Sequence, residues 1–468
     1  MTKKYAGSAI AIVLATGLAV PAALHAEAGD YGFWDTLYYL IWPAAADNPV
    51  APAQRSGDYP LRGSPAGFAD GFSPGLYGSW QTVQLAPGTG AVCSDGSPYK
   101  FFVNRVPGTS NTLFYVEGGG ACWDYATCSG KDRFGAINTN GIPDNYMSLL
   151  SGSIASLMSP LVTRISPFGE TVKTQNWNMV FLPYCTGDVH GGDKVAVYAN
   201  PEGADAQPLV YYHNGLRNQR AVIAWLKDHL QRPAQLLVTG SSAGGFGAEI
   251  NYHHVRRDIA PDKAFLLNDS GPLFDAPSRS NPTVYPSVPF HDTVRKAWNL
   301  AAPLSYLARD LPGLDQRNFV TLHASLAQRW PDDRMGLTSF WQDDTISGFS
   351  YRPFFADIEQ APDSITRQYR QLSRFRADMQ RTTPHLDRLS NFGYYLPQYR
   401  NLIGSHTVAT VDFQNGDIQE KNLQFKDFLN NVLDGSGAVM KASEVSDAAD
   451  HARATPLHYL LINEFGGF

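Results

Sequence analysis

The chain has 468 residues, of which 43% are hydrophobic and 17% charged, and its net charge at pH 7 is −6. This length suits one large domain with insertions or two domains, and no linker that would separate two domains is recognisable. With 37 basic against 43 acidic residues and no polybasic run, the composition argues against nucleic acid or an anionic membrane as a partner.

The N-terminus has the pattern of a secretory signal peptide. Two lysines precede an apolar run over residues 6–24, and Ala26 and Ala28 offer small residues for cleavage. We therefore expect residues 1–28 to be removed and the protein to be secreted or periplasmic. An uncleaved membrane anchor is the alternative, although glycines and a proline interrupt the run. No later segment is long and apolar enough to span a bilayer, so residues 29–468 are expected to form a single domain without stable membrane insertion.

Short apolar runs predict a sheet. Residues 29 to about 90 are rich in Pro, Gly and Ala with little periodicity, so we expect an irregular N-terminal wrap, with regular structure starting near Tyr99. Strand-forming runs then follow, separated by helical or loop segments, over residues 100–103, 113–116, 179–182, 236–239, 264–267, 337–341 and 407–411. Short apolar strands spaced by helices predict a mainly parallel sheet in an α/β fold.

Helical spacing of apolar residues predicts the helices that flank this sheet. One helix precedes the strand over residues 236–239, and a second follows it with a polar face, which includes His253 and His254, toward solvent. A third helix is predicted over residues 364–379, with one apolar face formed by Ile365, Tyr369, Leu372 and Met379.

Residues 275–335 form a candidate insertion, because helical patterns recur around residues 291–304 and 321–330 within it. An inserted cap over the carboxyl ends of the strands would control which substrate reaches a site there. Two ordinary sheet-covering helices explain the same pattern, so both interpretations stay open.

The strongest candidate for chemistry is Ser242. It lies in the sequence Gly-Ser-Ser-Ala-Gly of residues 240–244, between a predicted strand and a predicted helix, which is the setting of a nucleophile elbow. The glycines permit the sharp turn that presents a serine hydroxyl to a base. Residues 71–75 fit the same pattern, but no strand precedes them, so the context selects Ser242. A glycine-rich turn without chemistry is the alternative.

A glycine run supplies candidate donors for an oxyanion. Residues 117–121, Glu-Gly-Gly-Gly-Ala, directly follow the strand over residues 113–116. α/β hydrolases place one half of the oxyanion hole at that point, and the N–H of Ala243 would supply the other half. A glycine-rich packing turn is the alternative. A phosphate-binding loop is disfavoured because the run lacks the Lys-Ser/Thr ending.

The chain order of a hydrolase triad is nucleophile, acid, base, so the partners of Ser242 are expected downstream. His406 lies late in the chain beside a predicted strand and is the candidate base. The acid is less determined. Asp343 and Asp344 end a predicted strand and are favoured over Asp269, because a loop at that edge of the sheet can approach the histidine.

Four cysteines in an exported chain suggest two disulfides, for which three connectivities exist. A bond between Cys122 and Cys128 would close a short loop after the glycine run and would leave Cys93 with Cys185. Four free thiols or a zinc site are the alternatives, and zinc is disfavoured because a Cys-x-x-Cys pair is missing.

Residues 186–193 also invite interpretation as a metal site, because they contain Asp188, His190 and Asp193. Hydrolytic metal sites usually show a recognisable ligand spacing, which is missing here. We therefore expect neither a metal nor another cofactor.

Together these motifs resemble those of the pectin acetylesterases and their animal relative Notum, a family of secreted α/β hydrolases that remove acyl groups. The resemblance rests on residues 93–97, 117–123, 176–178, 184–185, 240–245, 269–271 and 405–406. It implies the α/β-hydrolase fold, with Ser242 as nucleophile, His406 as base and Asp343 as acid. It also implies three oxyanion donors, the N–H groups of Gly119, Gly120 and Ala243.

Two positions depart from the family pattern. Relatives often carry an aromatic residue after the second glycine of the oxyanion loop, where this chain has Gly120 and Ala121. They also often carry Gln three residues after the acid, where this chain has Ile346. The first departure leaves the shape of the pocket open, and the second leaves Asp343 and Asp344 both open as the acid.

The sequence therefore predicts a monomeric serine carboxylesterase. By resemblance, the leading substrate is an O-acetyl ester on a polysaccharide such as pectin. A longer acyl chain or a polyester is the alternative substrate, and a carbohydrate-binding relative that has lost activity is the alternative class.

Overall fold

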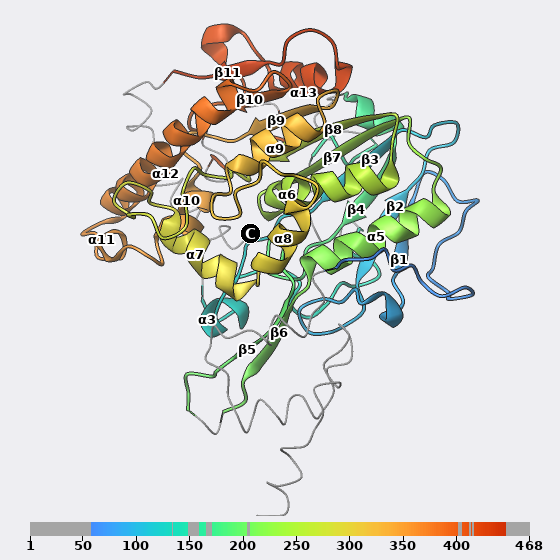
Figure 1. The fold of residues 1–468 in the computed structure, drawn as a ribbon, viewed down its shortest axis with the longest axis horizontal. Coiled ribbons are helices and arrows are strands. Elements are labelled where there is room, and N and C mark those ends of the chain that lie inside the picture. The colour runs from blue at the N-terminus through green and yellow to red at the C-terminus, as the bar shows by residue number, and fades with distance from the viewer. Residues whose placement is uncertain are drawn as a thin grey trace, which may run out of the picture.

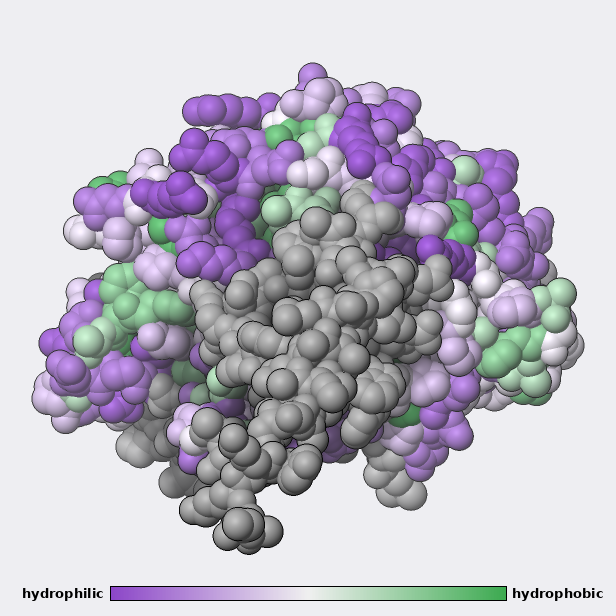
Figure 2. All heavy atoms as spheres, turned by 60° about the horizontal axis from the view of Figure 1, so that its bottom comes forward, coloured by the Kyte–Doolittle hydropathy of each residue, from purple (hydrophilic) through white to green (hydrophobic). Residues whose placement is uncertain are grey.

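The computed structural model describes residues 58–132, 134–147, 159–164, 171–203, 206–400, 405–410, 413 and 416–445. The predicted signal peptide and the first part of the predicted N-terminal wrap lie outside these residues. Within them, no helix combines the length and the hydropathy that crossing a membrane requires. On the face drawn in Figure 2, apolar side chains form small separate patches among hydrophilic ones.

A sheet of nine strands lies at the centre of the described residues, in the order β1-β2-β4-β3-β7-β8-β9-β10-β11. β1 and β2 are joined antiparallel at one edge, and every pair from β4 to β11 is parallel, which confirms the predicted mainly parallel sheet. The strands are β1 (Trp80–Gln84), β2 (Lys100–Asn104), β3 (Thr112–Val116), β4 (Asn178–Leu182), β7 (Gln235–Ser241), β8 (Lys263–Asp269), β9 (Arg334–Thr338), β10 (Phe392–Leu396) and β11 (Lys441–Ser443).

Helices cover the sheet, and α5 and α6 lie in front of its strands in Figure 1. Because the central strands are buried on both faces, they contain continuous apolar runs, such as residues 236–238 of β7 and 264–267 of β8, rather than alternating apolar and polar residues. The helices are α3 (Tyr125–Cys128), α5 (Gly215–His229), α6 (Ala243–Ile259), α7 (Val288–Ala297), α8 (Ala301–Ala308), α9 (Thr321–Arg329), α10 (Asp344–Tyr351), α11 (Ala356–Glu359), α12 (Ser364–Asp387) and α13 (Phe425–Asp434), with short 3-10 helices η3 (Pro87–Thr89), η4 (Lys173–Asn176) and η6 (Gln419–Lys421).

Several strands differ from the sequence prediction. Among the described residues, regular structure starts at β1, before Tyr99. β5 (Lys194–Tyr198) and β6 (Leu209–His213) form an unpredicted antiparallel ribbon that projects at the bottom of Figure 1. β9 begins at Arg334, whose guanidinium donates to the carbonyls of residues 436–438. Because these hydrogen bonds satisfy its charge, Arg334 can start the strand, whereas hydropathy predicts a start at residue 337.

The predicted strand over residues 407–411 is wrong for the residues described. Residues 408–410 form a turn, although their valine and threonine content favours strands. The N–H groups of Val408 and Ala409 donate to the side chain of Asp269 instead of to a neighbouring strand. A buried carboxylate from a distant segment thus overrides the local preference.

The polar face of α6 is buried, contrary to the prediction that it points to solvent. The side chains of Asn251 and His253 are 0% exposed. Asn251 donates to the carbonyl of His190, and His253 contacts Asp310 across 2.9 Å. These partners come from loops that pack over α6, so the polar residues mark buried hydrogen bonds rather than an exposed surface.

Two further helices depart from the prediction. α12 runs eight residues past the predicted end at residue 379, and Ile365 and Tyr369 are 65% and 64% exposed, because the first turns of the helix extend beyond the core. Leu372 and Met379 are buried as predicted. The pattern over residues 291–304 corresponds to two helices, α7 and α8, separated at Asn299, whose φ of 50° breaks the helix.

Candidate active site

Ser242 occupies a sharp turn between β7 and α6. Its φ is 60° and its ψ is −125°, a conformation that residues other than glycine rarely adopt and that nucleophile elbows require. Two glycines allow the turn, because a Cβ atom on Gly240 would lie 2.2 Å from the carbonyl oxygen of Val116 and one on Gly244 would lie 2.0 Å from it. The motif therefore packs α6 directly against the end of β3.

The glycine run after β3 lies against this turn. A Cβ atom on Gly118 would lie 2.9 Å from the Cβ of Ser242. Gly119 and Gly120 have φ values of 146° and 78°, which favour glycine. The carbonyl of Gly119 accepts a hydrogen bond from the N–H of Ile137, which holds the loop to the segment that follows.

The N–H groups of Gly119, Gly120 and Ala243 take part in none of the hydrogen bonds found among the described residues. α6 begins at Ala243, so this N–H has no intrahelical acceptor and lies at the positive end of the helix dipole. N–H donors in this state can stabilise an oxygen that gains negative charge beside Ser242.

His406 and Asp343 form a buried pair. The Nδ1 atom of His406 lies 2.9 Å from Oδ2 of Asp343, and the two residues are 6% and 0% exposed. The other carboxylate oxygen of Asp343 accepts the N–H of Ile346 and caps the N-terminus of α10. The cap therefore fixes the carboxylate that orients the imidazole.

The two other candidate acids lie elsewhere. Asp344 accepts a hydrogen bond from Nε2 of Gln371 on α12, and burial raises its pKa to about 6. Asp269, at the end of β8, accepts hydrogen bonds from Ser241 and from the backbone beyond His406, and burial raises its pKa to about 6. Of the three aspartates, Asp343 is the one in contact with His406.

The residues 186–193 are structural. Asp188 is 0% exposed and accepts hydrogen bonds from the hydroxyl of Thr186 and from the N–H groups of His190, Gly192 and Gly215. Burial raises the pKa of Asp188 to about 7 and lowers that of His190 to about 4. The neutral ring of His190 donates from Nε2 to the carbonyl of Glu117 at the start of the glycine run, which supports that loop.

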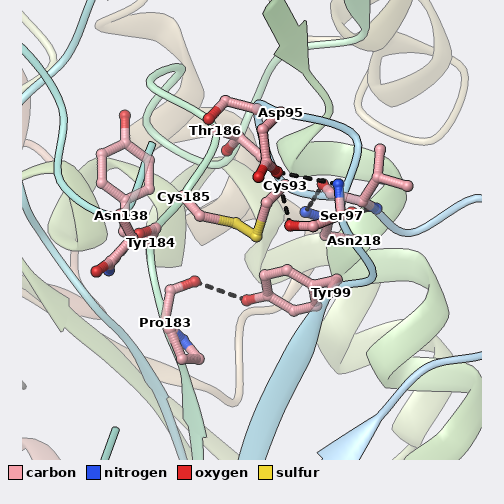
Figure 3. The surroundings of a disulfide bond; sticks show 12 residues. Cys93, Asp95, Ser97, Tyr99, Asn138, Pro183, Tyr184, Cys185, Thr186 and Asn218 are labelled. Carbon is pink, nitrogen blue, oxygen red and sulfur yellow. Dashed lines mark hydrogen bonds between the residues drawn. A yellow bond between two sulfur atoms is a disulfide. The ribbon is translucent and has the colours of Figure 1, made fainter. Parts of the chain in front are cut away.

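Both disulfides are present. Cys122–Cys128 follows the glycine run directly. Cys93–Cys185 joins the segment before β2 to the segment after β4, where Tyr99 also donates a hydrogen bond to the carbonyl of Pro183 (Figure 3).

His213 lies close enough to the sulfur atoms of Cys122 and Cys128 for all three to share a metal. Because both sulfurs are in the disulfide, they are not available as thiolate ligands.

Sequence reasoning missed an aromatic cluster beside the glycine run. Phe349 on α10 lies so close to Gly120 that a Cβ atom there would be 3.3 Å from its ring. The rings of Trp123, Phe134, Phe290 and Phe354 continue the cluster through edge and tilted contacts. Its members come from four separate segments, so no local sequence pattern predicts the cluster.

An apolar cavity, also missed, lies between α6 and helices α7 to α9. Its lining includes Phe246 and Ile250 of α6, Phe290 and Val294 of α7, and Leu273. Phe246 lies one helical turn beyond Ser242. The candidate cap helices therefore enclose an apolar space against α6, the helix that begins after Ser242.

Comparisons with known proteins agree with the resemblance. Residues 74–301, just under half of the chain, match the family model described as pectinacetylesterase. Palmitoleoyl-protein carboxylesterase NOTUM of Drosophila melanogaster is 23% identical over 219 residues, which cover 45% of this chain and 30% of that protein. Pectin acetylesterase 7 of Arabidopsis thaliana is 31% identical over 194 residues, which cover 40% of this chain and 44% of that protein. The matches thus span less than half of these relatives.

The fold has a solved counterpart. The structure of the Wnt deacylase Notum from Drosophila superposes with a TM-score of 0.51 at 19% identity, covering 78% of this chain and 97% of that one. The comparison confirms the α/β-hydrolase fold. Asp343 and His406 lie outside the family-model match.

Proposed function

From the match of residues 74–301 to the pectinacetylesterases, we propose that this protein is a carboxylic ester hydrolase that uses Ser242, His406 and Asp343. The observation that carries the proposal is the buried contact between His406 and Asp343, in a fold whose nucleophile turn holds Ser242. The names of the curated relatives, carboxylesterase and pectin acetylesterase, support the same reaction class.

The geometry fits an acyl-transfer mechanism. Asp343 accepts the Nδ1–H of His406, so Nε2 is the nitrogen that takes the proton when Ser242 attacks the ester carbonyl. The N–H groups of Gly119, Gly120 and Ala243 stabilise the oxyanion. His406 then returns the proton to the leaving alcohol, and a water activated by the same nitrogen releases the acid from Ser242.

The leading substrate is an acetyl ester on a polysaccharide such as pectin. Acetate release from acetylated pectin tests it, in parallel with chromogenic esters of increasing chain length. We expect efficient release of acetate and a preference for short acyl groups. A clear preference for long chains would remove the polysaccharide substrate.

A longer acyl chain or a polyester is the second candidate, and a specific observation favours it. The lining of the apolar cavity includes Val294 and also Phe246, which lies one helical turn after Ser242 on α6, and such a space suits a hydrocarbon chain. The name of the NOTUM relatives, palmitoleoyl-protein carboxylesterase, is consistent with this option.

Labelling by a fluorophosphonate tests the nucleophile and also addresses the inactive carbohydrate-binding alternative. We expect one label on Ser242 and its loss in Ser242→Ala. Equal labelling of the variant would exclude Ser242, and no labelling of the wild type would favour an inactive relative.

We also propose that the protein is exported and acts as a monomeric single domain, with residues 275–335 as a cap. Two disulfides support an oxidising compartment. N-terminal sequencing of the mature protein and its mass in solution test export and oligomeric state.

A further inference from the structure

The backbone on both sides of His406 is strained. Ser405 and Thr407 have φ values of 54° and 62°, in the left-handed region that residues other than glycine rarely adopt, and Thr407 is also β-branched. Such a conformation persists only where the surroundings hold the residue in place. The position of the His406 ring therefore depends on the groups that hold this loop.

Three consecutive N–H groups after His406 are held by the end of β8. Thr407 donates to Oγ of Ser270 at 3.1 Å. Val408 and Ala409 donate to the two carboxylate oxygens of Asp269 at 2.9 Å and 3.1 Å. Asp269 and Ser270 are 0% exposed, so water does not compete for these bonds.

The same aspartate also holds the nucleophile turn. The hydroxyl of Ser241 donates to Oδ2 of Asp269 at 2.8 Å, and the N–H of Ser242 donates to the backbone carbonyl of Asp269 at 2.8 Å. Ser241 and Asp269 end the paired strands β7 and β8 opposite each other. Asp269 thus contacts the turn of Ser242 on one side and the loop of His406 on the other.

We propose that Asp269 is a positioning residue that fixes the loop of His406 to the turn of Ser242 and so sets the base against the nucleophile. This inference rests on the proposed function. Asp269 does not orient the imidazole itself, because Nδ1 of His406 contacts Asp343. Its ionised carboxylate accepts hydrogen bonds from Ser241, Val408 and Ala409, and a longer one of 3.3 Å from the hydroxyl of Ser270.

The first test is Asp269→Asn, in which an NH2 group replaces one acceptor oxygen and opposes one of these donors. Displacement of the loop by a fraction of an ångström should lower kcat by roughly 10- to 100-fold with little change in KM. The matched control is Asp333→Asn. Asp333 is also buried, and it is held by Tyr252 and Arg256, so the variant should lose stability without losing kcat.

A double-variant cycle separates positioning from general damage. If Asp269 acts through His406, then introducing Asp269→Asn into the wild type should slow fluorophosphonate labelling. Introducing the same substitution into His406→Ala should not slow labelling further. If the labelling rate of the variant that carries both substitutions falls by the product of the two single losses, the proposal is overturned. If Asp269→Asn does not fold, Ser270→Ala, which removes the bond to Thr407, enters the same cycle with the same expected outcome.

The outcome also distinguishes this inference from the proposed function. Full activity in Ser242→Ala would contradict the proposed function. An inactive Ser242→Ala together with a normal kcat in Asp269→Asn would contradict the positioning role alone.

Discussion

Asp343 accepts a hydrogen bond from His406 across 2.9 Å, although 63 residues separate them in the chain. The same carboxylate caps α10 by accepting the N–H of Ile346. The neighbouring Asp344 lies inside the helix and contacts Gln371. One carboxylate therefore both caps a helix and contacts an imidazole, whereas its neighbour contacts α12.

The two aspartates should respond differently to the same substitution. Asp343→Asn leaves the cap acceptor but presents an amide to Nδ1 of His406, so we expect kcat to fall by roughly 10³- to 10⁴-fold. Asp344→Asn should keep kcat within a few-fold of the wild type. Steady-state kinetics on a chromogenic acetate ester measures both. The reverse order of effects would assign the acid to Asp344.

Asp344→Asn should also change how stability depends on pH. Burial, and then the charge of Asp343, raises the pKa of Asp344 from 3.8 to about 6. A carboxyl with a raised pKa stabilises the fold below its unfolded pKa, and this contribution is lost as the pH rises through 6. Asparagine does not titrate. The free energy of unfolding of the variant minus that of the wild type should therefore be about 2 kcal/mol larger at pH 8 than at pH 4.

Urea unfolding of Asp344→Asn and of the wild type at these two pH values measures that difference. A gap between Asp344→Asn and the wild type that does not change with pH would contradict the raised pKa.

The nucleophile turn and the central strands could be predicted because their signals are local. The glycines around Ser242 encode a turn that needs close backbone approach, and apolar runs such as that of β3 encode strands buried on both faces. Chain order selects His406 as the candidate base and leaves Asp343 and Asp344 both open as the acid. The contact between His406 and Asp343 distinguishes the two aspartates in the structure.

The remaining features depend on distant partners. The sequence leaves Asp269 open as the acid of the triad. In the structure, however, both of its carboxylate oxygens accept hydrogen bonds from Ser241, Val408 and Ala409, which are far from it in sequence. Those bonds also convert a strand-forming run into a turn. His253 looked solvent-facing, but its partner Asp310 lies 57 residues away. Local propensity carries no information about such contacts.

Gly118 should tolerate no side chain. A Cβ atom at this position would lie 2.2 Å from the carbonyl oxygen of Ser241 and would force the oxyanion loop away from Ser242. We expect Gly118→Ala to lower kcat by at least about 100-fold, the order of one lost oxyanion donor. Gly75→Ala is the control, because open space surrounds that glycine. Normal activity in Gly118→Ala would argue against this loop as the oxyanion hole.

The two disulfides should contribute unequally to stability. Cys93–Cys185 closes a loop with a sequence separation of 92, whereas Cys122–Cys128 closes one of 6. The loss of chain entropy in the unfolded state grows with loop length, so replacing the first pair by alanine should cost about 4–5 kcal/mol and the second about 2 kcal/mol. Chemical unfolding of the two double variants measures both losses. A greater loss for the short loop would point to native-state packing around Cys122 rather than to chain entropy.

Substitution of Val294 should decide whether the acyl chain enters the apolar cavity. Val294 on α7 is 3% exposed and lines this cavity together with Phe246, which lies one turn beyond Ser242. Val294→Phe fills space that a long chain would occupy and leaves the glycine run untouched. If long chains bind there, kcat/KM for an eight-carbon ester should fall by roughly tenfold, the order of one or two lost methylene contacts, while the acetyl ester keeps its rate.

Val294→Ala enlarges the same space and should shift the preference in the opposite direction. Both variants are compared as ratios of kcat/KM between the two esters, which cancels any loss of folded protein. If both ratios equal that of the wild type, the cavity is not the acyl site, and the short-chain substrate becomes the stronger candidate.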